Sequence, residues 1–503
     1  MIVRHIRRLA LAILFTILAP AISAAHVGSP DVIFDGKAGP YEVRVIVRVP
    51  QVVPGLADVT VRVLRGDVKE VRIRPVFWRA GVNGAPSADL AKPVRGASGL
   101  YSGQLWLMAR GAYSVYVTLA GPSGSGTASV PVMSVATGRL GMSAGLRGLL
   151  VTLGILLVAG LITIVYVAAG ESVVEPGRGM EPARRRRARI IGALAAPIFA
   201  LVLFGGARWW KSVDTTYQAR MYRAWSAQSE IDDRGYPTLK FTVVDGDGAP
   251  VPLDPLMPDH GKMMHLFVID SASMTTFAHL HPAQLAVNQF VTTAPPLPPG
   301  IYRLYGDVTM ETGQTHTWTS RLQVTRADSL ATAAAAHDTP RDSDDSWRVA
   351  RGVRRIGTSA VVDTLEDNST MEWLADSVVA RVGDEVTLRF RVRNPSGSLA
   401  TLQPYLGMNA HAVIAKRDGS VFIHLHPAGT ISMGAQEVFA LRDRGDTTAG
   451  GRLRHLDSMP FHEMPMTGEF SVPYVFPRSG DYRIWVQVRR DNRVLTGVFD
   501  VTL

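Results

Sequence analysis

Two long apolar stretches near the middle of the chain constrain its fold more than any other feature. One runs from Leu149 to Ala169, the other from Ile190 to Ala207, and neither contains a charged residue. Each is long enough to cross the roughly 30 Å hydrocarbon core of a bilayer as a helix. Six arginines crowd the short segment between them, and basic loops stay on the cytoplasmic side. We therefore predict transmembrane helices at 146–170 and 190–208, joined by a cytoplasmic Arg-rich loop at 171–189.

The first 25 residues have the pattern of an export signal. Arg4, Arg7 and Arg8 precede an apolar run, and small residues at 23–25 resemble a cleavage site. An uncleaved signal anchor is the alternative, and either form exports the residues that follow. We expect a bacterial inner (cytoplasmic) membrane protein with most of its mass in the periplasm. No acidic residue, lysine or histidine lies inside either apolar stretch, which disfavours a proton or ion transporter.

The exported parts have the sequence pattern of β-structure. Residues 41–65 alternate apolar and polar side chains and are rich in valine, as half-buried strands are. The same pattern recurs at 239–245, 265–269, 301–309, 385–393, 410–415 and 482–489. It predicts a mainly β chain with three Ig-like or cupredoxin-like antiparallel β-sandwich domains. Their expected ranges are 26–145, 236–326 and 351–503, with a membrane-proximal segment at 209–235 and a linker at 327–350.

The membrane-proximal segment mixes aromatic and charged residues, among them Tyr217, Tyr222 and Trp225. Such a segment suits the surface of a membrane or of a partner protein. A simple helical extension of the second span is the alternative interpretation.

An internal repeat links the second and third exported domains. Gly261-x-x-x-His265 is followed after a turn by Phe277-Ala-His-Leu-His-Pro282, and Gly407-x-x-x-His411 by Phe422-Ile-His-Leu-His-Pro427. Each copy later has a Gly-x-Tyr-Arg strand, beginning at Gly300 and at Gly480. The first exported domain lacks the His-Leu-His-Pro element. The repeat indicates a duplicated domain with a duplicated site.

The repeated histidines are spaced to share one face of a hairpin. Residues i and i+2 of a strand point the same way. A turn at Asp418-Gly419 places His411 opposite His426 and Val413 opposite His424. A turn centred near Ser273 similarly places His265 opposite His281. Opposed Cβ atoms lie about 4.5–5.5 Å apart, close enough for two imidazoles to bind one metal ion. The predicted metal ligands are His265, His279 and His281 in one site and His411, His424 and His426 in the other.

Composition narrows the choice of metal. The chain has 13 His, 17 Met and no Cys, which excludes thiolate copper centres and iron–sulfur clusters. Imidazole ligands suit Cu(II), Cu(I) or Zn(II), and thioether ligands favour Cu(I). Methionine also fills gaps in cores, so its clustering alone does not establish ligation. Additional ligand candidates are His26, as a mature N-terminal residue, and Met408, Met459, His462, Met464 and Met466.

These histidine-bearing strands resemble the bacterial periplasmic copper-handling domains of the CopC and YtkA-like kind. The resemblance covers about the last 270 residues and rests on the six histidines of the repeat. It implies small β-sandwich domains that bind copper. A structural role remains the alternative for the same histidines, as polar pairs that hydrogen-bond to loops.

The sequence lacks a His-Glu-x-x-His pair, a P-loop and a dinucleotide fingerprint. We therefore expect a non-catalytic protein that binds or delivers copper. The alternative is an accessory subunit that stabilises a larger membrane electron-transfer complex, such as a respiratory oxidase or a photosynthetic reaction centre. Expected partners are the lipid bilayer and a membrane or periplasmic protein. The net charge of +10 is partly due to the arginine loop, so no nucleic acid is expected.

Overall fold

The computed structural model contains mainly β-structure, with 48% of residues in strands and 21% in helices. It describes the chain except residues 1–25, 28–30, 172–176, 178, 223–224, 233–235, 246–248, 250, 252, 254, 336–340, 350–353, 357–359, 375–380 and 446–465. The predicted signal segment therefore lies outside the described residues. Two compact units are present. One comprises Met1–Val49, Pro54–Ser134 and Ala224–Leu503, and the other comprises Pro50–Val53 and Val135–Arg223.

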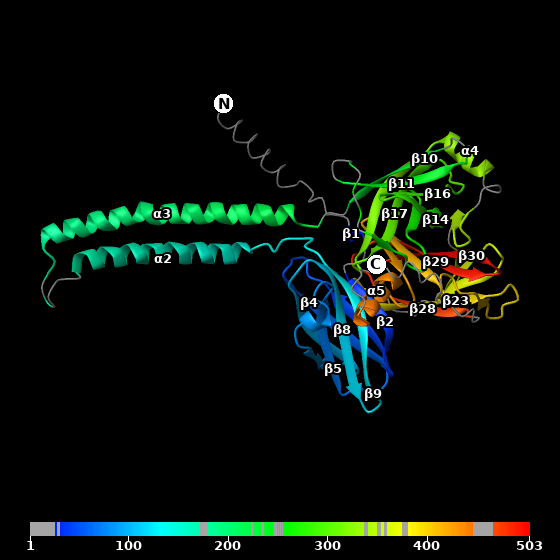
Figure 1. Ribbon diagram of the computed structural model, residues 1–503, viewed down its shortest axis with the longest axis horizontal. Coiled ribbons are helices and arrows are strands. Elements are labelled where there is room, and N and C mark those ends of the chain that lie inside the picture. The colour runs from blue at the N-terminus through cyan, green and yellow to red at the C-terminus, as the bar shows by residue number, and fades with distance from the viewer. Residues whose placement is uncertain are drawn as a thin grey trace. The chain divides into compact units, whose positions relative to one another are not determined.

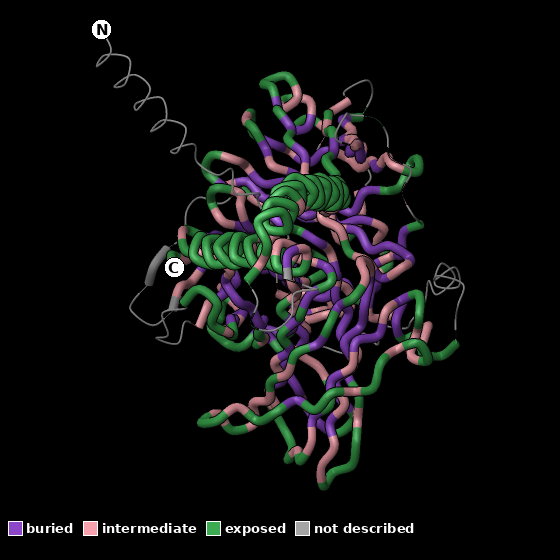
Figure 2. The backbone as a smooth tube through the Cα atoms, turned by 90° about the vertical axis from the view of Figure 1, so that its left-hand side faces the viewer, coloured by how far each residue is buried: buried purple, intermediate pink, exposed green. Residues whose placement is uncertain are grey.

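The second unit is dominated by a helical hairpin of α2 (Ala144–Glu171) and α3 (Pro182–Ala219) (Figure 1). Both helices are long and apolar enough to cross a membrane. Their side chains are exposed over almost the whole length (Figure 2). Gly192 of α3 faces Tyr166 of α2, where a Cβ atom would come within 3.4 Å of the tyrosine Cβ.

Helix α3 is longer than the predicted span at both ends. It starts at Pro182, because proline suits the first helical turn and arginine is a good helix former. Residues 182–189 of the predicted loop, which contain five of its six arginines, are therefore helical. Beyond the span the helix continues to Ala219, which corresponds to the alternative interpretation of the membrane-proximal segment. The end of that segment, however, is strand β10 (Ser226–Asp232) of the next domain.

The first β-domain is an antiparallel sheet of eight strands in the order β2-β3-β4-β7-β6-β5-β8-β9. Alternate valines and other apolar residues of these strands form one buried core. The bounds are β2 (Asp31–Ala38), β3 (Tyr41–Arg48), β4 (Gly55–Arg65), β5 (Glu70–Phe77), β6 (Asp89–Pro93), β7 (Leu100–Leu107), β8 (Gly111–Gly121) and β9 (Gly124–Ser134), with a short 3-10 turn η1 (Val82–Gly84) after β5. The strands predicted within 41–65 are confirmed.

The second β-domain is built on a sheet in the order β15-β16-β11-β10-β18-β17-β13-β14-β19, with β12 paired to β17. Apart from β10, its strands are β11 (Thr238–Val244), β12 (Leu256–Met257), β13 (His265–Asp270), β14 (Thr276–Leu280), β15 (Ala283–Ala286), β16 (Gln289–Thr293), β17 (Gly300–Met310), β18 (Thr315–Val324) and β19 (Ser346–Val349). Part of the predicted linker forms regular secondary structure. It begins with α4 (Arg326–Ala334), which a Thr325/Asp328 capping box starts, and ends in β19 on the sheet edge.

The third β-domain packs two five-stranded sheets around a shared core. One sheet has the order β1-β26-β25-β29-β30 and the other β20-β21-β22-β23-β28, with a small β24-β27 pair beside them. The bounds are β1 (His26–Val27), β20 (Arg354–Ile356), β21 (Ala360–Thr364), β22 (Thr370–Trp373), β23 (Glu385–Arg393), β24 (Thr401–Leu402), β25 (His411–Lys416), β26 (Val421–Leu425), α5 (Met433–Asp443), β27 (Met466–Thr467), β28 (Glu469–Val475), β29 (Asp481–Arg490) and β30 (Arg493–Thr502).

The two repeat-bearing domains meet through the faces of their His-Leu-His-Pro hairpins. Phe277 stacks on Trp485 with ring centroids 4.9 Å apart, and Phe422 stacks on Tyr305 at 3.9 Å. Phe277 and Phe422 occupy equivalent repeat positions, as do Tyr305 and Trp485. Each hairpin therefore inserts the same phenylalanine against the same strand of its counterpart. This reciprocal contact is the geometry of a quasi-two-fold interface within one chain.

The first β-domain supports the third one beside the repeat. The backbone N–H of Asp35 donates to the Ala428 carbonyl oxygen at 2.8 Å, and the N–H of Thr430 donates to that of Ile33 at 2.9 Å. These bonds hold the loop that directly follows His426. Buried Arg44 also pairs with Asp35 and with Glu385 of the third domain. The domain without histidine motifs thus fixes one edge of the candidate site.

Candidate metal centre

The repeat histidines are placed by the predicted hairpins. β13 and β14 pair so that Phe267 is opposite His279, and β25 and β26 pair so that Val413 is opposite His424. Both registers are the predicted ones and are thereby confirmed. Extending each ladder by one step sets His265 against His281 and His411 against His426, and their ring centroids lie 5.1 and 5.0 Å apart.

The two histidine sets are not separate sites, because the hairpins face each other. The ring of His265 lies 5.2 Å from that of His424 in the other domain, and His279 lies 5.7 Å from His424. All six repeat histidines are at most 7% exposed. They form one buried cluster at the interface between the second and third domains. Two independent hairpin faces were expected, but burial of the adjoining aromatic residues brings the faces together.

A seventh histidine, His260, completes the cluster. Its ring lies 5.4 Å from His411 and 5.3 Å from His426 of the other domain. Sequence reasoning missed it because the third domain has Leu406 at the equivalent position. The repeat did contain a signal, since each of these residues precedes the repeated glycine. Both take a left-handed backbone, with φ of 53° at His260 and 49° at Leu406.

Two groups of three histidines are compact enough to hold a metal ion. His265, His279 and His281 form one group, and His260, His411 and His426 form the other. Within each group the nitrogen atoms all lie within 4.8 Å of one another. The first group is the predicted one, whereas in the second His260 replaces His424. His424 lies between the groups, with its ring 4.5 Å from that of His426.

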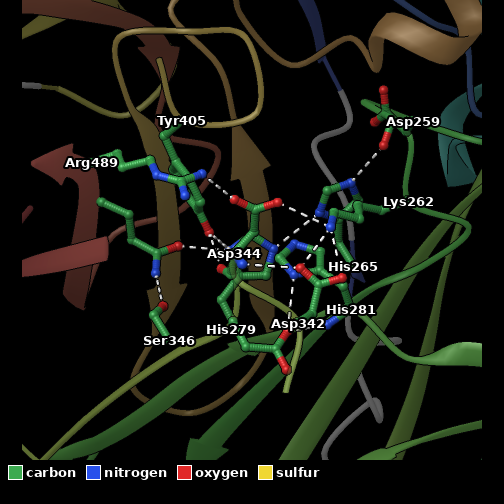
Figure 3. A network of polar contacts seen from close by, with 12 residues as sticks. Asp259, Lys262, His265, His279, His281, Asp342, Asp344, Ser346, Tyr405 and Arg489 are labelled. Carbon is green, nitrogen blue, oxygen red and sulfur yellow. Dashed lines mark hydrogen bonds and ion pairs between the residues drawn. The ribbon is translucent and has the colours of Figure 1, made fainter. Parts of the chain in front are cut away.

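Hydrogen bonds to outside acceptors fix which nitrogen of several rings carries the proton. Nδ1–H of His279 donates to Oε1 of Gln487 at 2.8 Å, and Nδ1–H of His281 donates to Asp345 at 3.0 Å (Figure 3). Nδ1–H of His426 donates to the Ile431 carbonyl oxygen at 3.2 Å. Because a neutral imidazole has one N–H, Nε2 of each ring is left with a lone pair. Metal-binding histidines are oriented in the same way, by a second partner on the far nitrogen.

The cluster-facing nitrogens of His265 and His279 lie next to each other. Nδ1 of His265 is 3.0 Å from Nε2 of His279, whose proton is held on Nδ1 by Gln487. Nε2 of His265 is 3.3 Å from the Asp259 carbonyl oxygen, so this ring can carry its single proton on either side. The Tyr405 hydroxyl, 3.1 Å from Nδ1 of His279, donates to the Asp344 carbonyl oxygen and can accept from His279. With the His265 proton on Nδ1 the two rings share a hydrogen bond, and with that proton on Nε2 their lone pairs converge.

Other nitrogens of the cluster have no hydrogen-bond partner among the described residues. They are Nε2 of His260, His281, His424 and His426 and both ring nitrogens of His411. A buried polar atom without a partner costs about 1–3 kcal/mol, and such atoms are rare in native proteins. Six such nitrogens lie in this one cluster, where a bound group could satisfy them.

Burial keeps these imidazoles neutral. It lowers the pKa of His260 and of His426 to about 4 and that of His281 to about 3. Burial, and then repulsion between neighbouring rings, lowers the pKa values of the four remaining rings well below the usual value. Neutral imidazole is the form that binds a metal ion, so the cluster is ready to bind at neutral pH.

The quasi-two-fold arrangement extends to the residues around the histidines, but with one chemical difference. Gln487 faces His279 from the opposite domain, and its repeat equivalent Asp307 faces His424, with Oδ2 3.6 Å from Nδ1. Burial raises the pKa of Asp307 to about 7. One half of the cluster is therefore supported by an amide and the other by a carboxyl group, which makes the two halves electronically unequal.

The structure describes the backbone of three of the additional ligand candidates. Met466 packs against the third-domain core, and Met408 lies in a turn whose backbone bonds to Tyr405. His26 pairs through its backbone with Val421 in β26. Met459, His462 and Met464 lie outside the described residues.

Acidic residues of the predicted linker approach the cluster, which composition alone did not indicate. Asp345 and Asp342 form a further possible metal-binding group with His281. Lys262 pairs with Asp342 at 2.6 Å and with Asp344 at 3.0 Å. The only sequence signal was the run of acids at 342–345, in a segment otherwise typical of a linker.

Comparison with known proteins gives a family match but no functional neighbour. Residues 221–326 and 363–503 match the model of a domain of unknown function (DUF8832), and these segments carry both halves of the histidine cluster. No curated protein matches the chain in sequence.

Several solved structures show weak likeness. Escherichia coli alpha-2-macroglobulin has 9% identity and a TM-score of 0.20, covering 95% of this chain and 23% of its own. PorU from Porphyromonas gingivalis has 8% identity and a TM-score of 0.15, covering 94% of this chain and 34% of its own. Parabacteroides merdae beta-glucuronidase has 7% identity and a TM-score of 0.16, and the match covers 92% of this chain and 76% of its own. The chain thus spans about a quarter of the macroglobulin's length.

Proposed function

We propose that this chain is a non-catalytic, membrane-anchored copper-binding protein whose ions lie in the interdomain histidine cluster. The observation that carries the proposal is the convergence of imidazole nitrogens. Nδ1 of His265 and Nε2 of His279 lie 3.0 Å apart, and the far nitrogen of each ring faces an acceptor outside the cluster. With the proton of each ring on that far nitrogen, a metal ion between the rings would gain two coordinate bonds.

The cluster has enough ligands for two ions. Each group of three histidines offers three neutral nitrogen ligands and leaves a coordination position open, as transfer or substrate-binding sites do. His424, between the groups, is available to either ion. Imidazole binds zinc, copper, iron and nickel, and among divalent ions of this series Cu(II) is bound most tightly. We therefore propose copper, with zinc as the ion most able to replace it.

The two apolar helices support a membrane anchor. We propose that they hold the chain in a bacterial inner membrane, with the Arg-rich segment in the cytoplasm and the β-domains in the periplasm. The repeat-bearing domains would be of the cupredoxin-like kind. A metal-accepting or metal-donating protein of the same membrane is the partner that this arrangement favours.

The alternative is an accessory subunit in which the histidines are purely structural. A buried structural histidine normally has a hydrogen-bond partner at each ring nitrogen. The far nitrogens of His281 and His426 do have such partners. The near nitrogens of the same rings have no partner among the described residues. A structural role leaves these atoms unexplained, whereas metal binding uses them.

Metal content of the full chain, purified in mild detergent without chelator and then offered copper, tests the proposal. Elemental mass spectrometry should find about two equivalents after excess copper is removed. The variant His411→Gln/His426→Gln should lose about one equivalent, since it removes two of the three ligands in one group. His316→Gln is the matched control, because His316 stacks on Trp225 away from the cluster.

Tryptophan fluorescence would verify that each variant keeps the fold. An unmodified chain that takes up no copper or zinc would refute the proposal. So would a folded double variant with unchanged stoichiometry.

A further inference from the structure

A network of polar groups, among them Lys262 and Asp342, adjoins the buried histidines (Figure 3). The side chain of Asp342 is 29% exposed and that of Lys262 18%, whereas those of Asp345 and His281 are 0% and 1% exposed. His281 in turn lies 5.1 Å, ring to ring, from His265 inside the cluster. Asp342 is therefore the accessible end of this series, and both Asp345 and His281 are buried.

His281 belongs to two possible metal-binding groups at once. It completes the inner group with His265 and His279 and an outer group with Asp342 and Asp345. Its Nδ1 faces Asp345, and its Nε2 has no partner among the described residues. Oδ2 of Asp345 is also buried without a described partner. Both residues belong to the outer group, and each of the two unsatisfied atoms has a lone pair for a cation.

Lys262 is the cation that pairs with Asp342 of the outer group and with the neighbouring Asp344. Arg489 pairs with Asp344 at 2.7 Å, and Lys262 spans Asp342 and Asp344. Lysine is a compact charge on a flexible stem, so its ammonium group can leave without disturbing the backbone. Asp345 has the guanidinium of Arg341 nearby, but that side chain bonds to the Ala294 carbonyl oxygen and lies over Trp347.

We propose that Asp342, Asp345 and His281 form a loading site that receives a transition-metal dication from solution and passes it to the inner histidines. Lys262 holds the acidic groups together while the site is empty and withdraws when the ion arrives. Mixed carboxylate and imidazole ligands bind Cu(II) and Zn(II) less selectively than three imidazoles do, which suits a transient position. The inference rests on the proposed function, because it needs a metal ion in the inner group.

Stopped-flow mixing of the detergent-solubilised full chain with a Cu(II)–glycine chelate would test it, with quenching of tryptophan fluorescence as the readout. Asp342→Asn removes an outer ligand but no inner one, and should slow loading about tenfold, equivalent to about 1.4 kcal/mol. Lys262→Met removes the competing cation and should speed loading about fivefold, the factor for one unit charge at about 4 Å in water. Asp89→Asn, an exposed residue of the first domain, is the matched control.

The final copper stoichiometry separates this inference from the proposed function. Unchanged stoichiometry with opposite rate changes in the two variants supports the loading site. Unchanged stoichiometry with wild-type rates in both variants overturns it and leaves the copper centre intact. A wild-type chain that binds no copper overturns both proposals. A loss of one equivalent in Asp342→Asn would also overturn the loading site, because Asp342 would then be a permanent ligand.

Discussion

Nδ1 of His279 lies 2.8 Å from Oε1 of Gln487, although 208 residues separate them in the sequence. The histidine comes from the second β-domain and the glutamine from the third. The bond fixes the imidazole tautomer and locks the two domains together at the same point. Asp307 holds the equivalent place opposite His424, so the relation occurs twice with different chemistry.

Removing the Gln487 amide should weaken metal binding without removing a ligand. In Gln487→Leu the proton of His279 is no longer held on Nδ1, and loss of such an outer partner typically reduces metal affinity about 10–100-fold. Competition with a chelator of known affinity would measure the change. The stoichiometry should stay at the wild-type value, and Gln403→Leu, which alters a bond to Asn492, should leave the affinity unchanged. Equal affinities in both variants would contradict the role given to Gln487.

Copper should stabilise the β-domains, because its ligands come from both halves of the interface. Free metal at about 100 times the dissociation constant stabilises a folded state by about 2.7 kcal/mol. The thermal unfolding midpoint should therefore rise on addition of copper and return to its initial value with chelator. The rise should be smaller in His411→Gln/His426→Gln than in His316→Gln. Calorimetry that shows no metal-dependent shift in the unmodified chain would count against a cluster that binds metal.

Truncation of Trp485 should weaken the interface between the second and third β-domains, because it removes an aromatic contact across it. The residue is fully buried and stacks on Phe277, so Trp485→Ala should lower the free energy of unfolding by about 3–5 kcal/mol. Denaturant unfolding would measure the loss. Trp106→Ala is the matched control, since Trp106 is 57% exposed and should change stability by about 0.5 kcal/mol or less. Similar losses in both variants would show that the stacked pair does not join the domains.

The metal-free protein should lose stability on acidification. The pKa values of His260 and His426 are about 4 in the folded protein, below the ordinary 6.5. The unfolded chain therefore binds protons first, and the stability from these rings is lost as pH falls from about 6.5 to 4. Burial raises the pKa values of Asp307 and Asp345 to about 7, which acts in the opposite direction. Seven histidines outnumber two carboxyl groups, so the net effect is a loss.

Thermal unfolding in chelator between pH 4.5 and 8 would test this balance. The midpoint should be highest near neutral pH and should fall below pH 6.5. Replacing His260 by Gln should make the acid side of the profile shallower. A midpoint that rises as the pH falls from 6.5 to 4.5 would show that the carboxyl groups dominate.

Local patterns were sufficient to predict the hairpins. Period-2 alternation located β3, β4, β13, β17, β23, β25 and β29, and the turn positions set the registers around His265 and His411. These features depend on neighbours in the sequence, so a single chain reveals them. Length and hydropathy likewise indicated α2 and α3. Helix ends were less predictable, because the arginines before the second span are good helix formers despite their charge.

The sequence by itself determined that six histidines lie on the inner faces of two similar hairpins. Only the tertiary structure decided that those faces meet, because the contact depends on shape-matched burial of Phe277, Trp485, Phe422 and Tyr305 across the interface. Packing also brought in Gln487 and Asp345, which no local pattern connects to the repeat, and His260, which the repeat marks only as the residue before its glycine. The direction of each lone pair depends on such distant acceptors. The chemistry of the cluster is therefore a property of the packed domains, whereas six of its seven histidines belong to the hairpins.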